Sequence, residues 1–572
     1  MIRFQVDIAD LHAHLFGVTL TVAEPEAEQL LSLPAWIPGS YLVREFARHL
    51  SQLEARQGGR AVALTQRDKA TWMASCSGRG ELVVSWRVYA FDSSVRAAYL
   101  DATRGFFNGT GLLLRVHGRE AEPHRLTLGP LPHGWQVATA LTGDGQNFEA
   151  ADYDELVDHP VELGAFWRGS FKAQGVLHDV VVAGALPGFD GERLLADAKR
   201  ICQTQIAFWH GKKKPPFSRY LFLLNAVEEG HGGLEHRAST ALIANRRDLP
   251  RLGGGAASDG YANLLGLVSH EYFHTWNVKR LKPREFAQYD YRGENYTELL
   301  WFFEGFTSYY DDLMLRRAGL IDDARYLRLL AKALNNVLGT PGRALQSVAE
   351  ASFDAWVKYY RPEENSVNAT VSYYTKGALV ALAFDLSLRT EGEGSLDRVM
   401  QSLWQTSGGG PIDEGDIAAA LARVGARSYA GELAAWVHGR EELPLAALFE
   451  RMGIDWSDEP PTPAQRLGAR LTDAGGVLKL QAVMRGGAAE RAGLAAGDEL
   501  LALDGWRLRR IDDLSTLGAF ERPLALLAVR DQRLLTLTLP RAEVRGAVKL
   551  ALANEVDAST SARRERWLAG AP

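Results

Sequence analysis

Polar and apolar residues alternate over many short runs in the N-terminal part of the chain. Alternation with a period of two is typical of strands that bury one face, and turn residues separate the runs. Examples of short segments predicted as strands are 4–6, 19–22, 81–89 (ELVVSWRVY) and the apolar segment 112–116. The pattern predicts a β-sandwich-like domain over residues 1–178.

The periodicity changes after about residue 180. Apolar residues then recur at steps of three and four, which is typical of helices with one buried face. The segments with this spacing are 322–338, 375–388 and 413–424. Helices are also expected at 192–209, 259–277 and 296–316, and an apolar run at 220–225 predicts a strand. Residues 179–320 are therefore expected to mix helices and strands, and residues 321–456 to be mainly helical.

A polar, proline-rich stretch at 457–463 (SDEPPTP) is typical of an interdomain linker. Beyond it, GAAERAGLAAGDELLALDG at 487–505 strongly resembles the core motif of PDZ domains. Its glycines allow tight turns, and LLAL has the pattern of a buried strand. The resemblance implies a PDZ domain at 464–545, which would bind an extended peptide by strand addition. The alternative is a PDZ domain kept only as a structural module. Residues 546–572 remain as a tail, expected to be a short helix or disordered.

Composition narrows the class of protein. The chain has 572 residues, of which 46% are hydrophobic and 23% charged, as in globular proteins with several domains. The net charge of −6 gives no reason to expect a nucleic-acid partner or binding to an anionic membrane. The N-terminus lacks the apolar core of a secretory signal, and no run of apolar residues is long enough to span a membrane. We therefore expect a cytoplasmic protein.

The candidate chemistry lies in LLGLVSHEYFHTWNVKRLKP at 264–283, where His270, Glu271 and His274 form the pattern H-E-x-x-H. On a helix capped by Asp259, the two histidines lie one turn apart on one face and can hold one divalent ion, usually zinc. Glu271 then reaches a metal-bound water rather than the metal, as a general base would. The alternative is two helix histidines paired with neighbouring acids.

A catalytic zinc needs a third protein ligand and an open position. The acids that follow the motif are Glu285, Asp290, Glu294, Glu298 and Glu304. Glu304 stands in the apolar run WFFEGF, so we expect it to be buried and to need a compensating cation, either zinc or an arginine. Glu298 is the second candidate, and it does not share a helical face with Glu304.

These motifs resemble a known family. H-E-x-x-H followed by EGFTSYY at 304–310 is similar to the gluzincin metallopeptidases. The longer stretches HEYFHTWNVKRLKP and ELLWFFEGFTSYYDD are similar to the glycyl aminopeptidase family, whose members carry a C-terminal PDZ domain. AWIPGSYLVREF at 35–46 resembles part of that family's N-terminal domain, although the residues themselves favour a Pro-Gly turn with aromatic packing. The resemblance implies a thermolysin-like α+β catalytic domain at 179–320 and one zinc ion per chain, held by His270, His274 and Glu304.

Two further elements resemble the related aminopeptidase N family. GLEH at 233–236 is similar to its Gly-x-Met-Glu-Asn loop, which implies that Gly233 and Glu235 bind the substrate, with Glu235 on its free amino group. YTKG at 374–377 is similar to its catalytic tyrosine motif, which implies that Tyr374 donates to the oxyanion. Tyr373 is the alternative donor. The non-catalytic alternative for both tyrosines is a packing role. The alternative for Glu235 is a solvated loop residue that binds no substrate.

Together the motifs predict a zinc aminopeptidase acting on peptides with a free N-terminus. A preference for small N-terminal residues, glycine or alanine, is implied by the resemblance alone. Two other functions stay open. One is a zinc endopeptidase, in which Glu235 binds no amine; the other is a peptide-binding scaffold with an active PDZ domain and a vestigial metal site. The presence of all three ligands and the general base argues against the scaffold.

Overall fold

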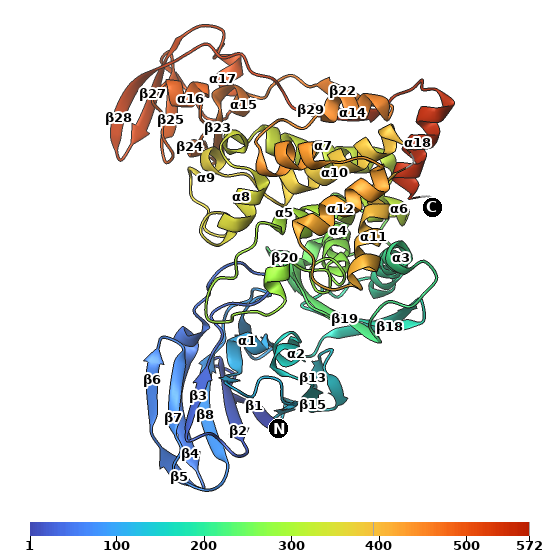
Figure 1. Cartoon of the computed structure of the whole chain (residues 1–572). Helices are drawn as coiled ribbons and strands as arrows, with labels where there is room; N and C mark the ends of the chain where they lie inside the picture. The colour runs from blue at the N-terminus through green and yellow to red at the C-terminus, as the bar shows by residue number, and fades with distance from the viewer. Residues whose placement is uncertain (393, 571–572) are drawn as a thin grey trace. The chain divides into compact units, whose positions relative to one another are not determined.

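The computed structural model describes residues 1–392 and 394–570, which form two compact units (Figure 1). The first unit holds Met1–Tyr296 with the short segments Arg317–Leu320 and Trp404–Ile412. The second holds Thr297–Arg316, Ile321–Leu403 and the chain from Asp413 onward.

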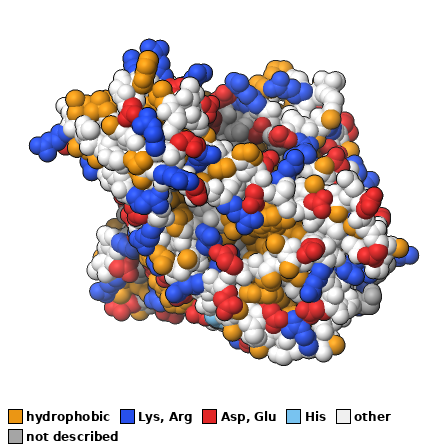
Figure 2. Space-filling model, turned by 90° about the horizontal axis from the view of Figure 1, so that it is seen from above, with side chains coloured by type: hydrophobic (Ala, Val, Ile, Leu, Met, Phe, Trp, Pro, Cys, Tyr) orange, Lys and Arg blue, Asp and Glu red, His pale blue; other side chains and the backbone are white. Residues whose placement is uncertain are grey.

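The surface carries charges of both signs. On the face shown in Figure 2, acidic and basic side chains are interspersed among apolar ones. Within the described residues, no helix has the length and apolar character needed to cross a membrane.

The N-terminal part of the first unit is rich in sheets, as predicted. Its widest sheet has the strand order β14 (Thr142–Asp144), β15 (Asn147–Ala150), β12 (His124–Leu128), β1 (Ile2–Asp10), β2 (Leu15–Val22), β8 (Leu82–Tyr89), β4 (Leu50–Gln57), β5 (Arg60–Val62). Two four-stranded sheets accompany it: β13 (Gln136–Ala138), β16 (Val161–Gly164), β10 (Arg104–Phe107), β9 (Ala98–Leu100), and β11 (Arg115–Val116), β3 (Glu28–Ser32), β7 (Thr71–Ser75), β6 (Leu64–Asp68). Phe4 and Val6 alternate inward along β1, as a half-buried strand requires.

Most of the segment 112–116, which was predicted as a strand, is not a strand. Only Arg115–Val116 pair, as β11, with strand β3. Helix α1 (Gly109–Leu112) occupies the start of the segment. The carbonyl of Leu112 accepts a hydrogen bond from Trp86 Nε1 at 3.1 Å, and that of Leu113 accepts one from the Tyr153 hydroxyl at 2.8 Å. Since side chains satisfy these buried carbonyls, the segment needs no neighbouring strand.

A five-stranded sheet forms the middle of the first unit. Its strand order is β17 (Trp167–Ala173), β18 (Val176–Ala183), β19 (Arg219–Val227), β21 (Ser239–Asn245), β20 (His231–Glu235). β20 is thus an edge strand, antiparallel to β21. The N-terminal core extends into this sheet through Leu221, Leu223, Leu234 and Ala241. N-terminal residues are therefore brought close to β20.

Two helices of the first unit match the predicted segments. The predicted helix at 192–209 is α3 (Gly191–His210). The helix predicted at 259–277 is α4 (Asp259–Phe273), and its N-cap is Ser258 rather than Asp259, because the Ser258 hydroxyl accepts the Tyr261 N–H at 3.1 Å.

The second unit is mainly helical up to Arg451, as predicted for this part of the chain. Its principal helices are α5 (Leu300–Phe303), α6 (Gly305–Arg317), α7 (Asp323–Leu338), α10 (Thr375–Glu391), α11 (Leu396–Ser407), α12 (Glu414–Gly425) and α14 (Leu445–Arg451). The helix predicted at 296–316 is therefore interrupted at Glu304.

A separate sheet with its own apolar core is inserted near the C-terminus. Strand β22 (Ile454–Asp458) pairs with β29 (Val548–Leu552), and the inserted strands lie between them in sequence: β23 (Ala469–Ala474), β24 (Val477–Val483), β25 (Glu499–Leu503), β26 (Trp506–Arg507), β27 (Leu524–Arg530), β28 (Arg533–Leu539). The predicted linker thus begins as a paired strand. The tail ends in helix α18 (Ala558–Ala569), because Trp567 is buried and donates to the Tyr309 hydroxyl of α6 at 2.9 Å.

Candidate metal centre

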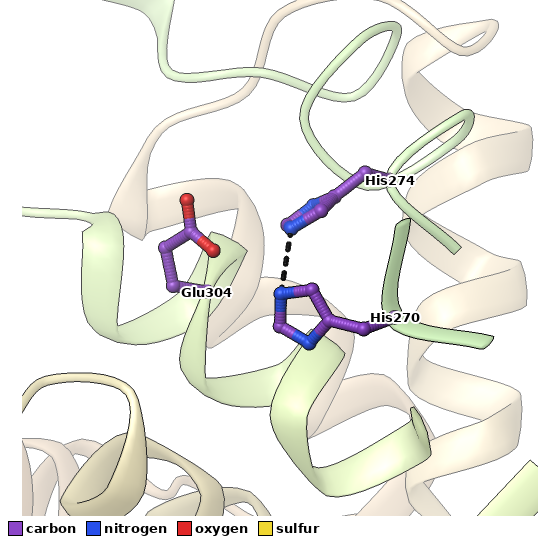
Figure 3. Close-up of side chains that lie close together, drawn as sticks. All are labelled: His270, His274 and Glu304. Carbon is purple, nitrogen blue, oxygen red and sulfur yellow. Dashed lines mark hydrogen bonds between the residues drawn. The ribbon is translucent and has the colours of Figure 1, made fainter. Parts of the chain in front are cut away.

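The end of α4 positions two imidazoles. His270 lies in the last turn and His274 at the C-cap, and their Nε2 atoms are 3.0 Å apart (Figure 3). His274 Nδ1 is 2.7 Å from the carbonyl of Asn277, and since a carbonyl only accepts, this nitrogen carries the proton. The Nε2 lone pair of His274 is then available to a metal, with the ring held in place by the hydrogen bond.

Glu304 completes a set of three potential ligands. One ligand atom from each of His270, His274 and Glu304 lies within 4.8 Å of the others, and Figure 3 shows the carboxylate beside the two rings. Two nitrogens bound at about 2.0–2.1 Å to a tetrahedral ion would be roughly 3.3 Å apart, close to the separation of the two Nε2 atoms. Glu304 is only 2% exposed, whereas Glu298, the other candidate, is exposed and outside this cluster. The donor set fits zinc.

Two glycines bring the tyrosine motif to Glu304. A Cβ on Gly305 would lie 2.5 Å from Gly377 Cα and 2.9 Å from the Tyr373 carbonyl, so α6 and α10 touch backbone to backbone. Neither position has room for a side chain. The glycine that follows Glu304 and the glycine of the YTKG motif therefore face each other.

Tyr373 and Tyr374 differ in exposure. Tyr373 is fully buried, whereas Tyr374 is half-buried and its hydroxyl lies 3.3 Å from that of Tyr360. Burial, reinforced by the Glu304 carboxylate, raises the pKa of Tyr374 well above its usual value. Tyr374 therefore stays a neutral hydrogen-bond donor across the physiological pH range. Tyr360 was not predicted as a site residue, because it belongs to no recognisable motif.

Strand β20 lies directly against the Glu271 side chain. A Cβ on Gly233 would lie 2.1 Å from Glu271 Oε1, so only glycine leaves space for this carboxylate. Glu271 is 5% exposed. The glycine of the GLEH segment thus sets the position of the candidate general base.

Glu235, two residues further along β20, is buried beside an N-terminal turn. Its exposure is 4%, and a Cβ on Gly39 would lie 2.6 Å from both carboxylate oxygens. Pro38 and Gly39 form the predicted turn, with Gly39 at φ +92° and the Ser40 N–H donating to the Ile37 carbonyl at 3.1 Å. The turn was predicted from the sequence, but its contact with Glu235 was not, because no local signal marks that contact.

Asp158 connects the two segments that flank the site. It lies 2.7 Å from Lys279 Nζ and 3.4 Å from His236 Nδ1. Burial alone would raise the pKa of Asp158, but Lys279, His236 and Arg237 outweigh it and hold the pKa well below its usual value. The histidine of GLEH and the lysine of NVKRLKP thus share one buried anion. No pattern around Asp158 could have indicated this role.

Comparison with known proteins agrees with this geometry. Residues 3–165 match the peptidase M61 N-terminal domain, and residues 263–380 match the M61 glycyl aminopeptidase. The structure is similar to that of an aminopeptidase N family protein from Idiomarina loihiensis, with 36% identity and a TM-score of 0.93 over 99% of this chain and 100% of that one.

More remote structures also match. An M1 zinc metallopeptidase from Deinococcus radiodurans has 16% identity and a TM-score of 0.47, over 78% of this chain and 94% of that one. A variant of that enzyme bound to a Tyr-Ser-Ala substrate has 16% identity and a TM-score of 0.48 over the same shares. No curated protein matches the chain. From the two family matches and the full-length similarity, the chain belongs to the M61 glycyl aminopeptidase family of zinc metallopeptidases.

Proposed function

We propose that this metallopeptidase is an aminopeptidase that releases small N-terminal residues, glycine or alanine first, from peptides with a free N-terminus. The main support is the buried carboxylate of Glu235. Its carboxylate is 4% exposed, and among the described residues none forms an ion pair or side-chain hydrogen bond with it. A buried carboxylate needs a cation, and the ammonium of a peptide's first residue supplies one. The preference for small residues is supported by the glycyl aminopeptidase match.

Each side chain then has a defined task. His270, His274 and Glu304 would hold one zinc ion per chain, which when bound polarises the scissile carbonyl and lowers the pKa of its water. Glu271 takes a proton from the attacking water at its carboxylate and returns it to the leaving amine. The Tyr374 hydroxyl donates to the carbonyl oxygen as that oxygen gains negative charge.

We also propose that the inserted C-terminal sheet, residues 464–545, is a PDZ domain that binds an extended peptide. Its support is the glycine-rich motif, in which Gly493 and Gly497 have φ of +83° and +90°, as tight turns require. We propose the remaining boundaries at 1–178, 179–320, 321–456 and 546–572.

Replacing Glu235 with alanine tests the amine-binding role. A charge-assisted pair in a shielded site contributes about 1.5–3 kcal/mol, so kcat/KM for free-amine peptides should fall roughly ten- to a hundredfold. The advantage of free over N-acetylated peptides should shrink, and zinc content should stay near one ion per chain. Glu229→Ala, an exposed acid six residues earlier, is the matched control. Parental rates in Glu235→Ala would remove the basis for an aminopeptidase and favour an endopeptidase.

Replacing Tyr374 with phenylalanine tests the oxyanion donor. The change removes one O–H and little volume, and loss of one such donor costs about 3 kcal/mol, on the order of a hundredfold in kcat, with KM little changed. Tyr373→Phe is the control, because that fully buried ring should tolerate the change better. The reverse result, with Tyr374→Phe active and Tyr373→Phe inactive, would assign the donor role to Tyr373.

A further inference from the structure

The side chain of an arginine from the N-terminal part of the chain contacts strand β20. Arg96, between β8 and β9, is half-buried, and its Nη2 donates to the Gly233 carbonyl at 3.3 Å. Its Nη1 would be 4.0 Å from a Cβ on Gly232. Arg96 Nε is buried without a hydrogen bond, and among the described residues no carboxylate forms an ion pair with this guanidinium.

The position of this cation suggests an anion that arrives with the substrate. A partly buried guanidinium that has only a backbone carbonyl as partner keeps most of its charge uncompensated. Gly233, which accepts its hydrogen bond, also lies against the Glu271 carboxylate. Arg96 is therefore close to the proposed point of cleavage and carries the charge opposite to that of Glu235.

The spacing along β20 fits a particular ligand. Arg96 donates to the carbonyl of Gly233. Gly233 and Glu235 are two residues apart, which is about 7 Å along a strand. An extended dipeptide spans about the same distance between its ends. An ammonium at Glu235 would thus place a dipeptide's carboxylate near Arg96, whereas a longer peptide would present a neutral main-chain carbonyl there.

We propose that Arg96 binds the C-terminal carboxylate of short peptides, so that unblocked dipeptides are the preferred substrates. This rests on the proposed aminopeptidase function, because the register is set by the ammonium at Glu235. Arg96 acts as a substrate-binding residue, and its guanidinium can offer two parallel N–H donors to the carboxylate.

Glycyl-alanine and its C-terminal amide are the test pair, since they differ only in the terminal charge. The wild-type enzyme should hydrolyse the acid with a kcat/KM about ten- to a hundredfold higher than the amide, mainly through KM. In Arg96→Met the ratio should fall to near one, with the amide changed less than about threefold. Arg96→Lys should keep an intermediate preference, since it retains the charge but not the paired donors. Arg125→Met, an exposed arginine of the same N-terminal part, is the control.

Equal wild-type kcat/KM for the acid and the amide would overturn the proposal even if no variant folded. Equal losses on both substrates in Arg96→Met would also overturn it, because the arginine would then only support β20. N-acetyl-glycyl-alanine tests the proposed aminopeptidase function separately from the role of Arg96. If neither free-amine peptide outperforms the acetylated one, the aminopeptidase proposal fails; if both do but without a preference for the acid, only the role of Arg96 fails.

Discussion

Replacing Glu271 with glutamine should lower kcat by about 10²–10⁴-fold and leave bound zinc unchanged. Glutamine has nearly the same shape and cannot accept the proton of the attacking water. The isosteric change matters here, because Gly233 approaches this side chain so closely that no larger group fits. Glu271 is not in the three-residue ligand cluster, so its loss should not release the metal.

The measurement is kcat on a glycyl reporter substrate together with metal analysis of the same preparation. Glu298→Gln, an exposed acid outside the cluster, provides the control and should retain the parental rate. An active Glu271→Gln enzyme with full zinc would show that another group accepts the proton. An inactive variant lacking zinc would instead make Glu271 part of the ligand set.

Replacing Glu304 with glutamine should weaken zinc binding by more than the roughly 10–100-fold that is lost when a residue hydrogen-bonded to a metal ligand is removed. The substitution exchanges an anionic ligand for a neutral amide. At zinc concentrations near the protein concentration, most chains should then lose the ion and their activity. High zinc should restore part of the rate, because both histidines remain.

Thermal unfolding provides a readout independent of activity. Zinc at about 1,000 times its Kd stabilises the folded state by about 4 kcal/mol, so a chelator should lower the Tm of the parental enzyme. The chelator effect should shrink in Glu304→Gln, whereas Glu298→Gln should behave like the parent. If Glu298→Gln lost the zinc response and Glu304→Gln kept it, the third ligand would be Glu298.

Turns and loops of the N-terminal part of the chain contribute directly to the proposed substrate site. Gly39 lies against Glu235, Arg96 lies against Gly233, and Asp158 pairs with Lys279 and lies 3.4 Å from His236. All three contacts converge on β20 or on residues next to it. Residues of the N-terminal domain are therefore expected to influence which peptides are cleaved.

The local features of this chain could be predicted from its sequence. The spacing of His270 and His274 places both on one helix face whatever surrounds them, because helical geometry repeats over a few residues. The apolar run around Glu304 indicated its burial, and alternation along β1 predicted a half-buried strand, since both depend on adjacent residues. The break at Glu304 was not predicted; it lies next to the place where Gly305 meets Gly377 of another helix.

Which distant residues meet at the site depends on how the elements pack together, and it could not be predicted from the sequence. Gly39, Arg96 and Asp158 lie between 78 and 196 residues before Glu235 or its neighbours. The local sequence indicated the turn at Gly39 but not its contact with Glu235, and no local pattern marks Arg96 or Asp158. They reach β20 because the N-terminal sheets and the five-stranded sheet share one buried core. Contacts of this kind depend on how whole sheets pack together, which no periodicity within a single segment encodes.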